Sequence, residues 1–226
     1  MIFVEKKFFA VMSITVALLG SAACGDNNNE GAEEKPLAKA EISQAVLRQG
    51  DVPGYTIRDN SGVKSDPTAR AAEKSCQPVV AVMAPTASRD VQRLAVRSIT
   101  KTPTGSEVPK ASYLLVLSSA NSEAAAKQAV HDLRSAISAC SSGFKVTFSG
   151  EDYAIRHMTV NDSGLGEEGV DFSLEYQMGR KIRYAVVQNG ASVTSVSASD
   201  QSERNFVAIP QKILSAQQQK LDKAAG

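Results

Sequence analysis

Apolar and polar residues alternate one for one through much of the second half of the chain, between Phe144 and Ala198. In the segment 170–177 the apolar set is Val170, Phe172, Leu174 and Tyr176. The pattern recurs in 182–188 and in 191–198. Alternation with a period of two predicts β-strands that bury one face and leave the other in water. Such strands restrict the chain to folds built around an antiparallel sheet.

Two hairpins follow from this pattern. If both apolar sets face the same core, Leu174 lies opposite Tyr184 and Glu175 lies opposite Arg183, which leaves a three-residue loop over 178–180. Asn189-Gly190 is a typical two-residue hairpin turn, and it joins the strands at 182–188 and 191–198.

The first half of the chain and the C-terminus supply helices and the remaining strands. We expect helices over 38–49, 68–75, from Pro78 to before Pro85, from an Asn121 cap to Cys140, and over 210–221. Further strands are expected over 89–100, 111–118, 144–148 and 153–160, with the apolar 113–117 in a central position, and a short extended piece is expected over 55–58. The fold class is therefore α+β, an antiparallel sheet of about six or seven strands with helices packed on it, in a single domain over 38–222.

The N-terminus has the three parts of an export signal over residues 1–23. Lys6 and Lys7 precede an apolar run over 8–20, which at 13 residues is too short to span a bilayer as a helix. Ser21-Ala22-Ala23 then leads into Cys24. This junction resembles the lipobox of bacterial lipoproteins, although Ser21 stands where Leu is usual. The resemblance implies that Cys24 carries acyl chains such as palmitate and begins the mature protein. A secreted protein with a stray N-terminal cysteine is the alternative.

The three cysteines favour the lipoprotein interpretation. In an oxidising compartment Cys76 and Cys140 are expected to pair as a disulfide, and lipidation of Cys24 removes the odd thiol. Two unpaired buried thiols are the alternative, while a redox-active pair is disfavoured because the Cys-x-x-Cys spacing is absent. Residues 24–37 are rich in Asn and acidic side chains, and we expect them to form a flexible tether.

Charge and composition exclude several function classes. The chain has 25 basic and 24 acidic residues, and the first 23 positions hold two of the lysines and one glutamate, so the mature chain is balanced. A balanced chain lacks the clustered positive charge that binds nucleic acid or anionic lipid. We therefore expect no nucleic-acid partner.

Three possible sites are better explained as ordinary structure. The segment 164–169 matches G-x-G-x-x-G, but a predicted strand follows it where a nucleotide site requires a helix. Asp162, Glu167, Glu168 and Asp171 fit no calcium loop, and we interpret them as a solvated acidic loop. His131 and His157 are not at a metal-binding spacing and are interpreted as surface residues.

A family resemblance rests on short motifs. These are 42–47 followed by Asp51-Val52-Pro53-Gly54-Tyr55, then Ser75-Cys76-Gln77-Pro78, then Ala139-Cys140 and the loop 164–169. Over roughly 38–222 the chain resembles exported lipoproteins of high-GC Gram-positive bacteria, which are similar to the extracellular sensor domain of membrane-anchored Ser/Thr protein kinases. The resemblance implies an α+β domain that binds an extracellular ligand in a groove. That sensor domain typically has two disulfides, whereas this chain can form one, and no ligand-contacting residue is marked by the motifs.

These observations predict a non-enzymatic, lipid-anchored binding or sensor-like domain on the outer face of the cell membrane. Its partners would be the membrane, through the N-terminal lipid, and an unknown extracellular ligand or envelope protein, with no cofactor, metal or catalytic residue. One alternative is a carrier of a lipid or other apolar molecule, suggested by Ala185, Val187 and Val196 on the second sheet face. An exported hydrolase is a further alternative. It would need His131 or His157 in a polar cleft, and the sequence contains no G-x-S-x-G elbow. A purely structural envelope role is the last alternative.

Overall fold

A computed structural model describes residues 35–62, 66–85, 91–106 and 108–225. The predicted signal peptide and Cys24 lie outside these residues. None of the helices in the described part is long and apolar enough to span a membrane.

The described strands form one antiparallel sheet in the order β1-β3-β4-β9-β8-β7-β6-β5-β2. They are β1 (Tyr55–Asp59), β2 (Arg70–Ala71), β3 (Val91–Lys101), β4 (Ala111–Ala120), β5 (Phe144–Phe148), β6 (Glu151–Val160), β7 (Gly169–Tyr176), β8 (Lys181–Asn189) and β9 (Ser192–Asp200). The helices are α1 (Lys39–Ala45), α2 (Gln77–Met83), α3 (Glu123–Ala139) and α4 (Gln211–Ala225), with 3-10 turns η1 (Lys74–Cys76) and η2 (Gly166–Glu168). The α+β class is thus confirmed, with nine strands rather than six or seven.

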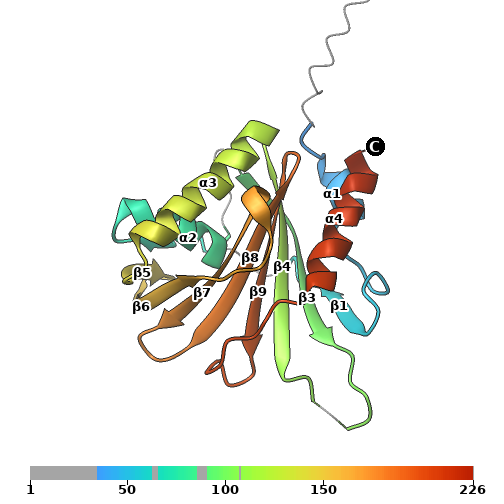
Figure 1. The fold of residues 1–226 in the computed structure, drawn as a ribbon. Coiled ribbons are helices and arrows are strands. Elements are labelled where there is room, and N and C mark those ends of the chain that lie inside the picture. The colour runs from blue at the N-terminus through green and yellow to red at the C-terminus, as the bar shows by residue number, and fades with distance from the viewer. Residues whose placement is uncertain (1–34, 63–65, 86–90, 107, 226) are drawn as a thin grey trace, which may run out of the picture. The chain divides into compact units, whose positions relative to one another are not determined.

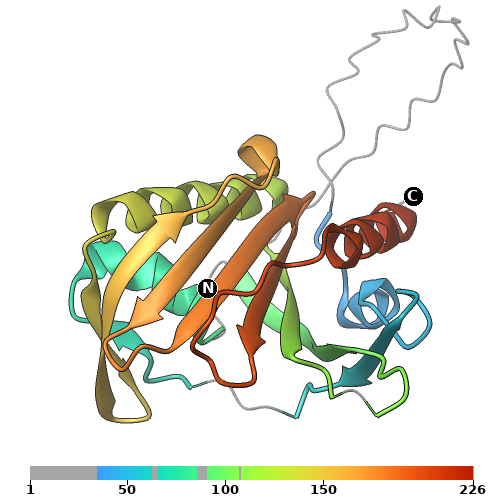
Figure 2. The same cartoon turned by 60° about the horizontal axis from the view of Figure 1, so that its bottom comes forward.

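Each face of the sheet packs against its own pair of helices. Because side chains alternate along β8, Tyr184 and Val186 belong to the core beneath α2 and α3, whereas Ala185 and Val187 belong to the core beneath α1 and α4. Figures 1 and 2 show α2 and α3 together over β5–β8, and α1 and α4 together at the other end of the sheet. The sheet therefore separates two cores.

The apolar second sheet face, which suggested a carrier of apolar molecules, is explained by this arrangement. Ala185, Val187 and Val196 are at most 3 % exposed, because α1 and α4 cover them. The second sheet face at these positions is ordinary core.

Most of the expected elements are present. The strands predicted over 89–100 and 111–118 are β3 and β4, and β4 lies between β3 and β9 as the apolar segment 113–117 predicted. The long helix is α3, although its N-cap is Ser122, whose hydroxyl accepts a hydrogen bond from the Ala125 amide, rather than Asn121. A strand follows the 164–169 loop, as expected.

Two helix predictions were wrong in extent or type. The segment 68–75, expected as a helix, contains strand β2, which pairs with β5 at Arg70↔Thr147 and Ala71↔Val146. The first helix ends at Ala45 rather than Gln49, because the chain becomes extended at Val46. Additional strands at the sheet edges, β1 and β2, account for the higher strand count.

The hairpin registers differ slightly from the predictions. In β7–β8 the pairs are Leu174↔Ile182 and Phe172↔Tyr184, a shift of two residues from the predicted register. A shift of two keeps every side chain on its predicted face. In β8–β9 the last pair is Asn189↔Ser192, so the turn residues are Gly190 and Ala191 rather than Asn189 and Gly190.

The disulfide between Cys76 and Cys140 is confirmed, with the two Cα atoms 5.9 Å apart. It joins η1, immediately before α2, to the C-cap of α3. Both cysteines are 3 % exposed. The bond therefore fixes one end of α2 against α3 inside the core.

Candidate functional site

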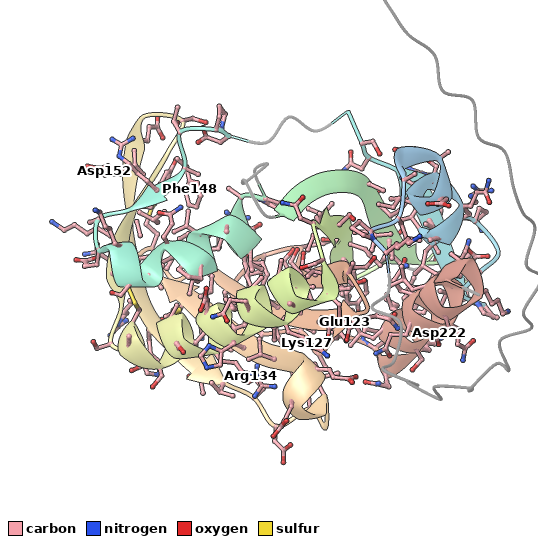
Figure 3. All side chains as sticks on the ribbon, turned by 90° about the horizontal axis from the view of Figure 1, so that it is seen from above. Glu123, Lys127, Arg134, Phe148, Asp152 and Asp222 are labelled. Carbon is pink, nitrogen blue, oxygen red and sulfur yellow. A yellow bond between two sulfur atoms is a disulfide. The ribbon has the colours of Figure 1, made fainter. Side chains whose placement is uncertain are left out.

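A hollow of about 690 Å³ opens on the α2–α3 face of the sheet. Its walls come from the C-terminal end of α2, the β5–β6 hairpin, the β7–β8 hairpin and the segment after β9. Figure 3 shows Phe148 and Asp152 at the end of the molecule away from α1 and α4. We call this space the tyrosine hollow, lined by Met83, Ala84, Phe148, Asp152, Tyr153, Tyr176, Arg180, Ile182, Tyr184, Glu203 and Arg204.

Sheet geometry sets the floor of the tyrosine hollow. Tyr176, at the end of β7, and Ile182 and Tyr184, in β8, project from the same face because of strand alternation. The loop between them turns at Gly179, whose φ of 79° is in the left-handed region that favours glycine. The Gly179 amide donates to the Tyr176 carbonyl, and the Tyr176 amide donates to the Arg180 carbonyl.

Two tyrosines are buried in this floor, but their hydroxyls are not paired. Tyr184 is 5 % exposed and Tyr176 is 9 % exposed. The Tyr184 ring stacks on Phe172, with ring centroids 5.2 Å apart. Neither hydroxyl has a hydrogen-bond partner among the described residues. In the described part of the chain, Thr194 Oγ1 is the one side-chain atom that is both without a partner and sealed from solvent, so the two phenol hydroxyls are not sealed. The two phenol hydroxyls are therefore accessible from the hollow.

An ion pair forms the polar rim of the tyrosine hollow. Arg180 Nε lies 2.7 Å from Glu203 Oε2, and the Arg180 guanidinium lies 5.4 Å from the centre of the Tyr176 ring. Glu203 has a φ of 55°, unusual for a residue other than glycine, and its carbonyl accepts a hydrogen bond from the Lys181 amide. Arg204 Nη1 donates to the Met178 carbonyl at 2.5 Å. Left-handed backbone at non-glycine residues is concentrated at functional sites.

Burial keeps both phenols protonated. Loss of hydration on burial raises the pKa of Tyr176 to about 12, partly offset by the nearby Arg180 guanidinium. Burial also raises the pKa of Tyr184 well above its ordinary value. At neutral pH both hydroxyls can therefore donate a hydrogen bond to an acceptor in the hollow.

The described lining of the tyrosine hollow combines hydrogen-bond donors with aromatic and aliphatic walls. Its described lining contains no histidine, cysteine or lysine, and Glu203 is already paired with Arg180. No group of three or more metal-ligating side chains occurs anywhere in the described part of the chain. The arrangement offers two phenol donors, aromatic and aliphatic walls, and an ion pair at the rim.

The histidines considered in the sequence lie away from this hollow. His131 is on the exposed surface of α3, with its Nδ1 3.7 Å from Asp132. His157 is exposed on β6 and pairs across the strands with Glu175. The structure does not bring the two histidines to one cleft.

The four acidic residues considered in the sequence differ in their exposure. Asp162, Glu167 and Glu168 are exposed, whereas Asp171 is 4 % exposed. Asp171 binds Arg183 through two hydrogen bonds of 2.8 and 2.9 Å. The interpretation of a solvated acidic loop was therefore wrong for Asp171, which forms a buried ion pair.

The polar cluster around Asp171 is extended by Asn161, which donates to Asp171 Oδ1 and to Ser173 Oγ. The loop carrying the G-x-G-x-x-G match is held to α3 by Arg134, which donates to the carbonyls of Gly166 and Gly169. Figure 3 shows Arg134 on the side of α3 that faces this loop. These contacts satisfy the loop's own backbone.

The sequence analysis did not find the tyrosine hollow. Tyr176 and Tyr184 were assigned to the apolar face of two strands, which is correct, but their free hydroxyls depend on what lies above them. The sequence did contain one indication of the hollow. The apolar sets of the strands at 170–177 and 182–188 each include a tyrosine, and the hydroxyl of a buried tyrosine usually finds a hydrogen-bond partner.

Comparison with known proteins finds a shared fold and little sequence similarity. No family model matches the chain. No curated protein matches it either. The crystal structure of the extracellular domain of PknH from Mycobacterium tuberculosis aligns with a TM-score of 0.51 at 14% identity, covering 84% of this chain and 98% of that one. An uncharacterised protein of Mycobacterium smegmatis, the Rv0999 ortholog, aligns at 0.36 and 8% identity, over 83% and 95% of the two chains. The chain is similar in fold to the PknH extracellular domain.

Proposed function

We propose that this protein is a non-enzymatic binding domain outside the cytoplasm, and that its ligand occupies the tyrosine hollow. The observation that carries the proposal is the pair of nine-tenths-buried phenols, Tyr176 and Tyr184, whose hydroxyls open into a space of about 690 Å³. That volume lies within the range of small-molecule sites, roughly 300–1,000 Å³. Because no protein group accepts from these hydroxyls, each is free to donate to a ligand acceptor in place of water.

The hollow indicates the chemistry of its ligand. Two donors in the floor require an acceptor such as a carbonyl or ether oxygen. The aromatic walls favour a ring or a compact apolar body. Arg180 is paired with Glu203, and the other two charged lining residues, Asp152 and Arg204, have opposite signs, so the lining carries no net charge. We therefore propose a neutral molecule that carries an oxygen acceptor on an apolar framework.

The fold supports a sensor-like role. Its likeness to the extracellular domain of PknH concerns the arrangement of the chain, at 14% identity. A disulfide at Cys76–Cys140 is consistent with an oxidising compartment. Neither histidine reaches the hollow, which favours binding over a hydrolase.

Membrane attachment through Cys24 is part of the same proposal. It rests on the apolar run, the small residues before Cys24, and the pairing of the other two cysteines. The mass of the protein extracted from bacterial membranes tests it. The proposal requires a chain that begins at Cys24 and carries acyl chains, and a chain that begins at Met1 or at unmodified Cys24 would refute it.

The binding proposal is tested with a small neutral probe, acetanilide, which joins one aromatic ring to one carbonyl acceptor. All described elements lie within 35–225, so the mature chain from residue 24 with Cys24→Ser keeps the whole fold and needs no detergent. We call this protein the anchor-free chain. It contains five tyrosines, so ¹³C-tyrosine spectra resolve each ring.

Acetanilide should shift the Tyr176 and Tyr184 signals with a Kd on the order of 1 mM. Tyr184→Phe or Tyr176→Phe should weaken binding about tenfold, since each removes one hydrogen bond. Tyr113→Phe is the matched control, because Tyr113 is also buried, at 8 % exposure, but belongs to the other core. Equal affinity of the wild type and of the Tyr176→Phe/Tyr184→Phe protein for acetanilide would refute the proposal. The absence of any shift at an acetanilide concentration about 20-fold above this Kd would refute it as well.

A further inference from the structure

A second cavity lies on the same face of the sheet, beneath the pair α2 and α3. Its volume is about 510 Å³. We call it the helix-pair cavity, with Ala81 and Val82 from α2, Ala129 and Leu133 from α3, and Val186 and Val193 from the sheet. We propose that it is a second binding site, separate from the tyrosine hollow, for the hydrocarbon chain of an uncharged amphiphile.

Small side chains keep this cavity open. Ala81 of α2 and Ala125 and Ala129 of α3 line the cavity from the exposed or half-buried flanks of the helices, whereas larger residues such as Val80 and Leu133 fill the core beneath. Protein interiors seldom leave voids much larger than a water molecule, so apolar space of this size suits an apolar ligand. Ala81, Gln128 and Asp132 are exposed, so the cavity is open to solvent at its mouth.

The roof of the cavity is held at one end. The Cys76–Cys140 disulfide joins the start of α2 to α3. The Gln77 side chain accepts a hydrogen bond from the Ala71 amide and donates to the Ala69 carbonyl. Together with Val79 and Val80, which are fully buried in the core, these contacts fix the position of α2 beside the cavity.

The floor supplies two hydroxyls for a polar head. Ser118 pairs with Val193 across β4 and β9, and Ser195 pairs with Val116, so Ser118 and Ser195 share one face as diagonal neighbours. Ser118 is 9 % exposed, and within the described residues neither hydroxyl has a hydrogen-bond partner. Each can bond to an oxygen on the ligand.

The charges around the cavity select an uncharged head. The described lining residues include no cation, and the nearest charged group is Asp132, which accepts a hydrogen bond from Gln128 Nε2 at 2.7 Å. A carboxylate head near Asp132 would be repelled by a like charge with no cation in the described lining, a repulsion that water partly screens because the Asp132 side chain is 52 % exposed. An alcohol or ester head can bond to the serines without this repulsion.

The test compares 1-octanol with octanoate, which have the same chain and differ in the charge of the head. Both are added below their micelle concentrations to the anchor-free chain, and binding is followed by the methyl signals of Val186 and Val193. We expect saturable shifts with 1-octanol and at least tenfold weaker binding of octanoate at pH 7.5. Absence of a saturable shift with 1-octanol, or octanoate binding as tightly, would overturn the proposal.

Four variants locate the site. Ala129→Phe fills the cavity and should abolish 1-octanol binding, whereas Ala124→Phe, on the exposed side of α3, should leave it unchanged. Because Ala129→Phe can also disturb folding, Ser118→Ala/Ser195→Ala provides a milder change and should weaken binding about tenfold. Tyr184→Phe should not affect 1-octanol. Unchanged binding in both cavity variants, or loss of binding in Tyr184→Phe, would contradict a separate site.

Discussion

Tyr176 shows how one buried side chain links the binding hollow to stability. Its ring is covered by Arg180 on one side, and its hydroxyl faces the hollow without a protein partner. Burial favours the neutral phenol, and this raises its pKa to about 12. The same burial that prepares the hydroxyl as a donor also makes the folded protein resist deprotonation.

The consequence is a loss of stability at alkaline pH. The folded-state pKa of about 12 is above the unfolded value of 10.0, so the folded state retains its proton longer. The contribution is fully present below pH 10 and is lost as the pH rises through 12. Between pH 9 and pH 11 the free energy of unfolding should fall by about 1.4 kcal/mol less in Tyr176→Phe than in the wild type.

Urea unfolding of the anchor-free chain at the two pH values measures this difference. Tyr113→Phe, from the other core, should change the pH dependence in the same direction, because burial also raises the pKa of Tyr113. Identical pH dependence in the wild type and in Tyr176→Phe would show that the phenol is not desolvated in the folded state.

At the level of single residues, the sequence predicted which side chains are buried better than what their polar atoms contact. Val170, Phe172 and Leu174 were assigned to the core and are at most 5 % exposed. Asp171 was assigned to solvent because its neighbours in sequence are acidic, yet its partner Arg183 is on the next strand. Partners across strands depend on the register, and the predicted register was two residues off.

At the level of elements, α4 is joined to α1 by one buried amide. Gln217 of α4 is fully buried, its Oε1 accepts a hydrogen bond from the Leu47 amide, and its Nε2 donates to the Ala45 carbonyl. These are backbone groups where α1 ends, which have no partner within the helix. Arg97 Nε donates to the Leu47 carbonyl at 3.0 Å and completes the junction.

Replacing this amide should therefore destabilise the domain. Gln217→Leu keeps the size of the side chain but leaves the Leu47 amide and the Ala45 carbonyl buried without partners, at a cost of about 2–4 kcal/mol. Gln219→Leu, at an exposed position of the same helix, should change stability by less than about 0.5 kcal/mol. Chemical denaturation of the two variants measures this. A change of equal size in both would mean that the amide does not hold α1 to α4.

Elements with a long periodic pattern were predicted well, and short ones were not. The pattern in α3 extends over five turns, from Ala126 to Ile137, and identifies the helix and its buried face. The segment 68–75 has no such length, and its two-residue strand β2 exists because β5 offers an edge to pair with. A tertiary contact decided that element, which local sequence cannot anticipate.

At the level of the whole molecule, both spaces lie on one face of the sheet. The face beneath α2 and α3 contains the tyrosine hollow and the helix-pair cavity, whereas α1 and α4 pack on the core of the other face. Residues of α2 line both spaces, Met83 in the first and Ala81 and Val82 in the second. The hollow combines four segments far apart in sequence, and for this reason periodicity revealed its floor but not the space above it.

Native mass spectrometry of the protein extracted from its own membranes tests the central claim most directly. The account predicts that wild-type protein and Tyr113→Phe retain a small neutral molecule that acetanilide displaces. It predicts that Tyr176→Phe/Tyr184→Phe, purified in the same way and equally folded, retains much less of it. Equal retention by the double variant, or no bound molecule in any of the three proteins, would contradict the claim that the two phenols form a ligand site.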